Sequence, residues 1–342
     1  MLEPPDTIDL TRMTDRIHEA YGMRIVSLNF LPLGADLDTA VYQASTADGA
    51  DWFVKLRGGN FNTASVVIPH LLHQQGVAEV IAPLATGGGD LTTQFGEYTM
   101  IVYPFIAGRD GYVQALSEAQ WHAFGRTLGK LHRAIFPASI RAAVPREQYD
   151  PTARHQLRWF LANPAPVATD ALAIELAEFL VQRHAAIHEL VERAERLAGQ
   201  LRQRDLPLVV CHGDLHAGNV LLSDDGRFFI VDWDTLIEAP CERDLMFFGG
   251  AQGFIGYQPE EETALFAAGY GSFTPDTAAL AYYRYERIIQ DMAIYCEQLL
   301  LSDAGGANRI PSLFYFKNNF RRGGTIERAA IDGDPIPGTL NQ

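Results

Sequence analysis

Residues 209–234 read VVCHGDLHAGNVLLSDDGRFFIVDWD, three short apolar runs with polar residues between them. The runs cover 209–211, 220–222 and 228–231, and the turn sequence DDG at 224–226 separates the last two. Short apolar runs bounded by turn residues are typical of buried strands. The stretch therefore predicts a small strand-rich segment whose polar side chains gather where the strands end.

The polar side chains of this segment are of the types that phosphoryl transfer requires. His212, Asp214 and Asn219 share one loop, and Asp232 ends the last strand. Transfer from ATP needs a residue that orients and deprotonates the acceptor hydroxyl, and it needs oxygen ligands that hold Mg²⁺ against the phosphates. We expect Asp214 to act on the acceptor, and Asn219 and Asp232 to bind Mg²⁺. A solvated turn between strands is the alternative.

The same residues resemble those of a known family. The order H-x-D-x-x-x-x-N is that of the protein-kinase catalytic loop, and Asp232 takes the place of the first residue of the kinase DFG motif, here followed by Trp233 and Asp234. HGDLHAGN with IVDWD resembles the aminoglycoside phosphotransferase and choline kinase branch of the kinase-like proteins. The resemblance implies an α+β bilobal fold, with a five-stranded antiparallel N-terminal lobe and a mostly helical C-terminal lobe. It also implies ATP, with GTP as an alternative donor, and Mg²⁺.

Hydrophobic periodicity along the chain agrees with two lobes. The spacing predicts helices over 11–21 and 63–75, the second containing Pro69, and strands over 25–33, 39–45, 52–56, 79–84 and 98–103. Further helices are expected over 117–134, 170–201, 242–253, 259–270, 275–300 and 311–322. We expect a nucleotide-binding lobe over 1–106 with a hinge at 103–107, a helical lobe over 107–331 that holds the catalytic loop and the acceptor site, and a loose tail over 332–342.

The resemblance also implies nucleotide-binding residues in the N-terminal lobe. Lys55 lies in the third strand, where the family's lysine reaches the α- and β-phosphates. The turn that begins at Gly34 would cover the phosphates, with a plain hairpin turn as the alternative. In the crossing segment, Pro104 offers a carbonyl and Ile106 offers an N–H, which are the two groups that adenine requires.

One expected partner of the lysine is missing. The family carries a glutamate on the first-lobe helix that pairs with the lysine, but residues 63–75 contain no acid. Lys55 is therefore expected to be held by Asp36 or by the amide of Asn62, or to be ordered only when nucleotide is bound.

Composition restricts the partners of the chain. It has 27 Lys and Arg against 42 Asp and Glu, a formal net charge of −15. This excess repels nucleic acid and anionic membrane surfaces and favours cationic small molecules. The three cysteines are an odd number without CxxC spacing, and the first residues show no secretion signal, so a reduced, cytoplasmic setting is expected. The oligomeric state stays open.

Two longer strings resemble one subgroup of the family, the spectinomycin phosphotransferases, which modify a hydroxyl of a dicationic aminocyclitol. They are APCERDLMFFGG at 239–250 and YYRYERI at 282–288. Residues that follow the catalytic loop would line an acceptor pocket with acids and an aromatic ring; they are Trp233, Asp234, Glu238, Glu286 and Asp291. His212 and Asp244 are expected to support the catalytic loop instead, because in kinase-like folds the equivalent acid hydrogen-bonds the loop backbone.

Two other functions stay open at this point. A kinase of another small amino alcohol, such as choline, ethanolamine or homoserine, would use the same phosphoryl-transfer residues. A nucleotide-binding pseudokinase would transfer nothing; the missing helix acid favours it, and the intact set Asp214, Asn219 and Asp232 opposes it.

Overall fold

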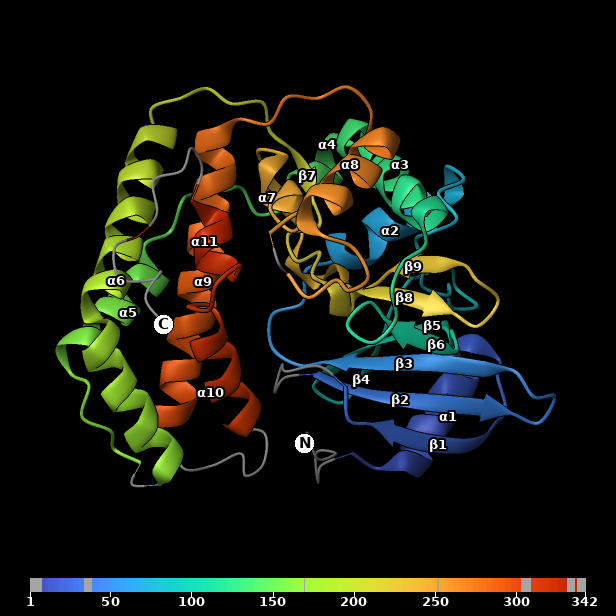
Figure 1. The fold of residues 1–342 in the computed structure, drawn as a ribbon. Coiled ribbons are helices and arrows are strands. Elements are labelled where there is room, and N and C mark those ends of the chain that lie inside the picture. Colours follow the sequence, from blue (N-terminus) through green and yellow to red (C-terminus); the bar gives the residue numbers. More distant parts are fainter. Residues whose placement is uncertain are drawn as a thin grey trace. The chain divides into compact units, whose positions relative to one another are not determined.

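The computed structural model describes residues 8–33, 39–168, 170–250, 252–302, 309–330 and 336 (Figure 1). The chain forms two compact units. The first unit comprises residues 1–114, 134–145 and 218–236, and the second comprises 115–133, 146–217 and 237–342. The strand-rich segment 209–234 therefore has residues in both units: residues 209–217 belong to the second unit and residues 218–234 to the first.

The first unit contains a five-stranded antiparallel sheet in the order β1-β2-β3-β5-β4. Its strands are β1 (Ile25–Leu31), β2 (Thr39–Thr46), β3 (Asp51–Arg57), β4 (Thr93–Phe95) and β5 (Tyr98–Pro104). The helix α1 (Leu10–Tyr21) packs on this sheet through Met13 and Ile17, which are fully buried. Lys55 sits in the middle strand β3, opposite Val41 of β2 and Ile101 of β5. The expected fold class is confirmed.

One strand of the sheet lies elsewhere than predicted. Residues 79–84 form no strand; Val80 makes only an isolated parallel bridge with Ile230. Pro83 cannot donate to a strand ladder, which explains why this apolar run does not join the sheet. The fifth strand is instead β4, a short segment that turns at Gly96 into β5.

A smaller sheet and a helix complete the first unit. The strands β6 (Gly108–Asp110), β8 (Val220–Ser223) and β9 (Phe228–Ile230) form a sheet in the order β6-β8-β9. The sequence analysis did not predict β6. The helix α2 (Ala64–Gln74) begins before Pro69 and contains it, so the proline does not delay the start of the helix. The short helix α4 (Ala138–Arg141) and the 3₁₀ turn η2 (Trp233–Thr235) both contact α2.

The second unit is mostly helical. Its core lies among α5 (Thr152–Ala162), α6 (Ala171–Leu201), α9 (Thr277–Leu300), α10 (Arg309–Asn318) and α11 (Thr325–Ala329), and Figure 1 shows α6 and α9 side by side. The remaining helices are α3 (Glu118–Arg133), α7 (Glu242–Leu245) and α8 (Pro259–Tyr270), and α3 packs on α8. The strands β7 (Val209–Cys211) and β10 (Ile237–Ala239) pair antiparallel.

Several predicted boundaries change for physical reasons. The helix expected over 242–253 ends at Leu245, and the glycines that follow, Gly249 and Gly253, have φ angles of 65° and 93°, which no helix contains. The Asp170 carboxylate caps α6 by accepting from the N–H groups of Leu172 and Ala173, as an N-cap residue does. The helix α5 was not predicted, because prolines on both sides of it interrupt the pattern.

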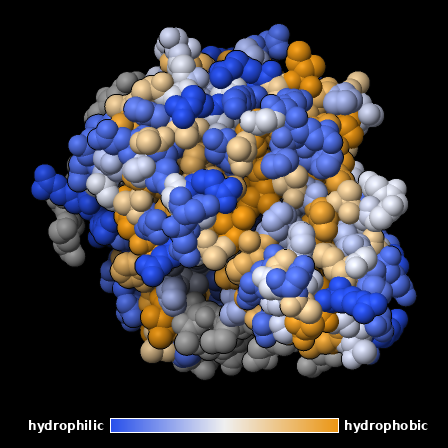
Figure 2. All heavy atoms as spheres, turned by 90° about the vertical axis from the view of Figure 1, so that its right-hand side faces the viewer, coloured by the Kyte–Doolittle hydropathy of each residue, from blue (hydrophilic) through white to orange (hydrophobic). Residues whose placement is uncertain are grey.

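The described surface mixes residue types. On the face drawn in Figure 2, hydrophilic and hydrophobic residues lie side by side, as is usual for folded proteins. A search of the described helices finds none that combines the length and the apolar composition of a membrane span.

Candidate functional site

Asp214 of the catalytic-loop motif is held by an ion pair in the second unit. It follows β7 on the loop, and its Oδ1 accepts a hydrogen bond of 2.6 Å from the guanidinium of Arg287 on α9. Its Oδ2 lies 3.5 Å from Nε2 of His216. Burial alone would raise the pKa of Asp214, but the hydrogen bond with His216 and the charge of Arg287 outweigh it and hold the pKa well below its usual range. The carboxylate is therefore ionised at neutral pH.

The backbone of this loop is fixed by a buried carboxylate. Asp244, which is fully buried, accepts hydrogen bonds from the N–H groups of His212 at 2.9 Å and Gly213 at 2.7 Å. These are the contacts that the resemblance implies for this acid. Asp244 also lies 2.9 Å from Nε2 of His132 on α3, whose other ring nitrogen is 2.8 Å from the hydroxyl of Tyr270. Burial opposes the charge of Asp244, but His132 and the other partners keep its pKa below the usual value.

Cys211 lies close enough to His132 and Asp244 for the three to resemble a metal site. All three are buried, and each already has hydrogen-bond partners among protein groups: the thiol of Cys211 contacts backbone carbonyls of Ala239 and Pro240. Burial raises the pKa of the Cys211 thiol, which disfavours the thiolate that a metal requires. This group supports the loop.

Lys55 finds its partners in the first unit, at the end of the IVDWD segment. Its ammonium lies 2.7 Å from Oδ2 of Asp234 and 3.0 Å from Oδ1 of Asp232. Arg57 adds a second cation, 3.5 Å from Asp234. Burial lowers the pKa of Lys55, but the two carboxylates outweigh burial and raise it. The lysine is charged and held without a helix acid.

Of the two partners proposed for Lys55 from the sequence, Asn62 has another role in the structure. The side chain of Asn62 donates to the carbonyl of Ala143 and accepts from the N–H of Ala64, so it fixes the start of α2. Asp36 lies outside the described residues, as does Gly34.

The two predicted metal ligands lie next to neighbouring strands of the first unit. Asn219 precedes β8, Asp232 follows β9, and the carbonyl of Asn219 accepts from the N–H of Val231. Asp232 has a φ of 60°, a left-handed conformation that is costly for a residue other than glycine and that is often found at functional sites. An amide and a carboxylate are oxygen donors of the kind Mg²⁺ prefers, so the donor set fits this ion.

The predicted crossing segment lies at the end of β5. Pro104 is opposite Trp52 of β3 and ends the strand, and the N–H of Phe105 donates to the carbonyl of Asp51. Ile106 follows between β5 and β6 and is half-buried. Pro104 and Ile106 thus lie at the end of β5 and just beyond it, next to β3, the strand that holds Lys55.

The residues expected to line an acceptor pocket separate into two groups. Asp234 contacts Lys55, and Asp291 contacts Arg287 at 3.2 Å. Trp233 is buried, with its indole donating to the carbonyl of Ile230, which is a packing role.

Glu286 and Glu238 have structural roles, as Trp233 does. Glu286 is 3% exposed and pairs with the equally buried Arg154 at 2.6 Å; burial raises the pKa of Glu286 to about 7 despite that pair. Glu238 lies within β10 and accepts from the N–H of Glu147 through its carbonyl. These positions support the fold of the second unit and give no support to contact with an acceptor.

Two residues of the site were missed from the sequence. Arg287 stands next to Glu286 in the string YYRYERI, and its spacing of four from Asp291 on a helix was the signal for their pair. His132 had no such signal, because its partner Asp244 is 112 residues away in the chain.

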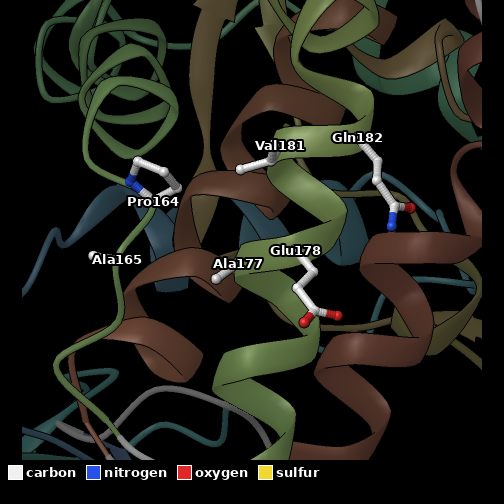
Figure 3. A pocket seen from close by; sticks show the side chains of 6 residues that line it. All are labelled: Pro164, Ala165, Ala177, Glu178, Val181 and Gln182. Carbon is white, nitrogen blue, oxygen red and sulfur yellow. The ribbon is translucent and has the colours of Figure 1, made fainter.

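A surface depression lies elsewhere, on the outer side of α6 (Figure 3). Its lining is Pro164, Ala165, Ala177, Glu178, Val181 and Gln182. It contains one carboxylate and no second catalytic group, so it offers no chemistry that a phosphotransferase needs.

Comparisons with known proteins show the family to which the chain belongs. Residues 29–283 match the sequence model of the phosphotransferase enzyme family. The solved structure of the spectinomycin phosphotransferase APH(9)-Ia in complex with ADP and spectinomycin is 35% identical, with a TM-score of 0.87 over 95% of this chain and 98% of that one. A microcompartment-associated aminopropanol kinase is 13% identical, with a TM-score of 0.60, and shares the fold.

The curated relatives match a smaller part of the chain. Protein StrN of Streptomyces griseus is 28% identical over 251 residues, which are 71% of this chain and 76% of StrN. Stress response kinase A of Escherichia coli strain K12 is 30% identical over 251 residues, 70% of this chain and 66% of that kinase.

Proposed function

The chain belongs to the phosphotransferase enzyme family, and from this premise we propose that it transfers the γ-phosphoryl group of ATP to a hydroxyl of a cationic aminocyclitol, with spectinomycin as the acceptor. One observation carries the choice of acceptor. The likeness to the spectinomycin phosphotransferase extends over 95% of the chain at 35% identity, and that enzyme was crystallised with ADP and spectinomycin. GTP is an alternative donor that the test includes.

Asp214 is assigned to the acceptor. In the reaction, the acceptor oxygen forms a bond to the γ-phosphorus as the bond from that phosphorus to the β-bridging oxygen breaks, and ADP leaves. The hydroxyl proton passes to the Asp214 carboxylate, which is ionised and held in place by Arg287. Phosphoryl transfer depends more on positioning and charge than on a strong base, so a carboxylate with a low pKa suits this role.

Lys55 and the strand-end residues are assigned to the nucleotide. Lys55 is charged, and its ammonium would bind the α- and β-phosphates. Asn219 and Asp232 would hold Mg²⁺, which when bound neutralises charge on the β- and γ-phosphates. The carbonyl of Pro104 and the N–H of Ile106 would hold adenine.

The negative charge of the chain favours a cationic acceptor. A net charge of −15 raises the local concentration of a dication and speeds its capture. Since the Debye length falls from ~10 Å at 0.1 M salt to ~3 Å at 1 M, kcat/KM for spectinomycin should fall as salt rises, mainly through slower capture.

The test is a panel of acceptors with the purified full-length chain. ATP or GTP and Mg²⁺ are supplied with spectinomycin, with larger aminoglycosides, with choline, ethanolamine and homoserine, and with a generic protein substrate. Spectinomycin that gains the mass of one phosphoryl group, in a reaction that Asp214→Asn abolishes, supports the proposal. Turnover of an amino alcohol or of the protein substrate, with none of spectinomycin, assigns the other acceptor. Nucleotide binding without turnover of any acceptor assigns the pseudokinase.

A further inference from the structure

Arg287 on α9 contacts Asp214, the carboxylate that we assign to the acceptor. The guanidinium of Arg287 lies between two carboxylates, 2.6 Å from Oδ1 of Asp214 and 3.2 Å from Asp291. All three side chains are partly buried, with exposed fractions of 21%, 20% and 31%. The guanidinium also stands over the ring of Phe247, 5.9 Å from its centre. Three contacts, two ion pairs and one aromatic ring, thus restrict the Arg287 side chain.

The fold singles out Arg287 among the charged residues of α9. Arg284, one turn earlier, donates to the backbone carbonyls of Met246, Phe248 and Arg328. It therefore joins α9 to α11 and to the segment that follows α7. Glu286 faces Arg154. Arg287 alone of these three contacts a carboxylate of the catalytic-loop motif, and Asp291, four residues later on the same helix face, supports it from behind.

We propose that Arg287, braced by Asp291, is the positioning residue of the acceptor carboxylate: by binding Oδ1 of Asp214 it sets the direction in which that carboxylate meets the acceptor hydroxyl. This inference rests on the proposed function, in which Asp214 faces the acceptor. It adds a residue that acts through Asp214 and does not itself contact the reacting atoms.

The need for such a residue follows from the freedom of the side chain. The terminal torsion of an aspartate is broad, so a carboxylate without a fixed partner samples many directions. A guanidinium is planar and always charged, with donors in a rigid fork, so it fixes a carboxylate that a flexible lysine would leave mobile. In phosphoryl transfer most of the rate comes from alignment, and a displacement of about 1 Å can cost ~10²-fold.

The same contact contributes, after the hydrogen bond with His216, to keeping the pKa of Asp214 low. The charged and titratable groups that face it are Arg287, His216 and His212, with Asp291 behind the arginine. Removing Arg287 deletes the cation that contacts both Asp214 and Asp291. The repulsion between these two negative carboxylates is then no longer offset. The pKa of Asp214 must then rise.

The experiment compares Arg287→Met and Arg287→Lys with wild type and with a matched control. Arg158 supplies the control, because it also bridges two carboxylates, Glu192 and Glu195, in the same unit and contacts no residue of the site. We expect Arg287→Met to lower kcat by on the order of 10²-fold while KM for ATP stays unchanged. In the pH profile of kcat/KM, the decline on the acid side should occur at higher pH in Arg287→Met than in wild type. Arg287→Lys keeps the positive charge but loses the forked guanidinium. It should therefore keep the wild-type acid limb and show a kcat between those of Arg287→Met and wild type. The control Arg158→Met should change neither kcat nor the acid limb.

A second readout does not depend on turnover. Aspartate labelled with ¹³C at the carboxyl carbon allows Asp214 to be followed by NMR, with its signal identified by its loss in Asp214→Asn. Wild type should show Asp214 titrating well below the usual range, and Arg287→Met should raise its pKa. An unchanged titration in Arg287→Met overturns the inference whatever the activity.

The two proposals fail in different ways. Wild-type protein that phosphorylates no acceptor removes the proposed function and, with it, the positioning role. Wild-type protein that is active, with Arg287→Met equal to Arg158→Met in kcat and in its acid limb, removes the inference alone. Where Arg287→Met does not fold, Arg287→Lys decides: full kcat in this variant removes the inference, and a partial loss of kcat at wild-type KM for ATP supports it.

Discussion

The ammonium of Lys55 lies 2.7 Å from a carboxylate oxygen of Asp234, which is the second aspartate of the IVDWD segment. The first-lobe helix that would supply a counter-ion in the family has no acid here, since α2 reads ASVVIPHLLHQ. Asp234, in the 3₁₀ turn η2 of the same unit, takes over the task, with Asp232 as a second partner at 3.0 Å. A lysine held in this way keeps its direction without any contribution from the helix.

Asp234→Asn tests this pair. The variant loses the closer of the two carboxylates around Lys55, and a charge-assisted hydrogen bond contributes ~1.5–3 kcal/mol. We expect KM for ATP to rise about tenfold or more, because ~1.4 kcal/mol corresponds to a factor of ten. Steady-state kinetics at saturating acceptor measure it. Asp90→Asn, at an exposed position of the same unit, is the control, and equal behaviour of the two variants would contradict the role of Asp234.

Asp214→Ala separates the acceptor from the nucleotide. The carboxylate is assigned to the acceptor hydroxyl, so its loss should lower kcat at least ~10²-fold, the usual lower value for general base catalysis. Binding of ATP measured by calorimetry should change little. A variant that keeps more than about a hundredth of the wild-type kcat argues against this assignment.

Asp232→Asn tests the metal assignment. If Asp232 and Asn219 hold Mg²⁺, the variant should lose Mg²⁺-dependent nucleotide affinity and keep most of the metal-free affinity. Titrations of the nucleotide with and without Mg²⁺ give both values. The same loss in the two titrations would mean that Asp232 acts only through Lys55, which it contacts.

Asp244→Asn tests the support of the catalytic loop. The fully buried carboxylate accepts from two backbone N–H groups and from His132, and an asparagine turns donors toward at least one of them. Because an unsatisfied buried group costs ~1–3 kcal/mol, we expect the free energy of unfolding to fall by on the order of 3 kcal/mol. Urea unfolding measures the loss. Asp205→Asn, which changes an exposed aspartate of the same unit, should cost almost nothing, and a similar loss in both variants would contradict the prediction.

The parts of the site that the sequence could predict are those fixed by short spacings. His212, Asp214, Asn219 and Asp232 lie within one strand-rich segment, and local hydrophobic patterns place them at strand ends. Local apolar runs separated by turn residues predicted five strands in the N-terminal lobe, and four of them correspond to β1, β2, β3 and β5. Periodicity also located α8 and α9 to within two residues of their observed starts.

The rest depends on contacts between segments far apart in the chain. Lys55 pairs with residues 177 and 179 positions later, and Arg287 pairs with a carboxylate 73 positions earlier. Any of the many acids in the sequence satisfies the charge of a lysine equally well, so only the fold selects the partner. The misplaced fifth strand has a local cause: an apolar run predicts a strand, but Pro83 denies it a ladder hydrogen bond.

Glu262 is a buried carboxylate on α8 that the proposed reaction does not use. It is 4% exposed, and its Oε2 accepts one long hydrogen bond, 3.4 Å from the N–H of Gly249. Burial raises the pKa of Glu262 from 4.5 to about 7, against smaller opposing effects of that hydrogen bond and of Arg328. The folded state therefore holds this proton more tightly than the unfolded state does. As pH rises from about 4.5 to about 7, the free energy of unfolding loses this contribution, because the unfolded chain releases its proton first.

Glu262→Gln removes the charge and keeps an oxygen that accepts from Gly249. At pH 8 the variant should be more stable than wild type by up to ~3 kcal/mol, since each unit of pKa shift corresponds to ~1.4 kcal/mol. At pH 5 the two should differ little, because the wild-type carboxyl is then protonated in the folded state and only partly ionised in the unfolded one. Urea unfolding at the two pH values measures the difference, with Glu178→Gln on the exposed face of α6 as the control. A stability gain that is equal at pH 5 and pH 8 would mean that the substitution acts through packing and that Glu262 is already ionised at no cost.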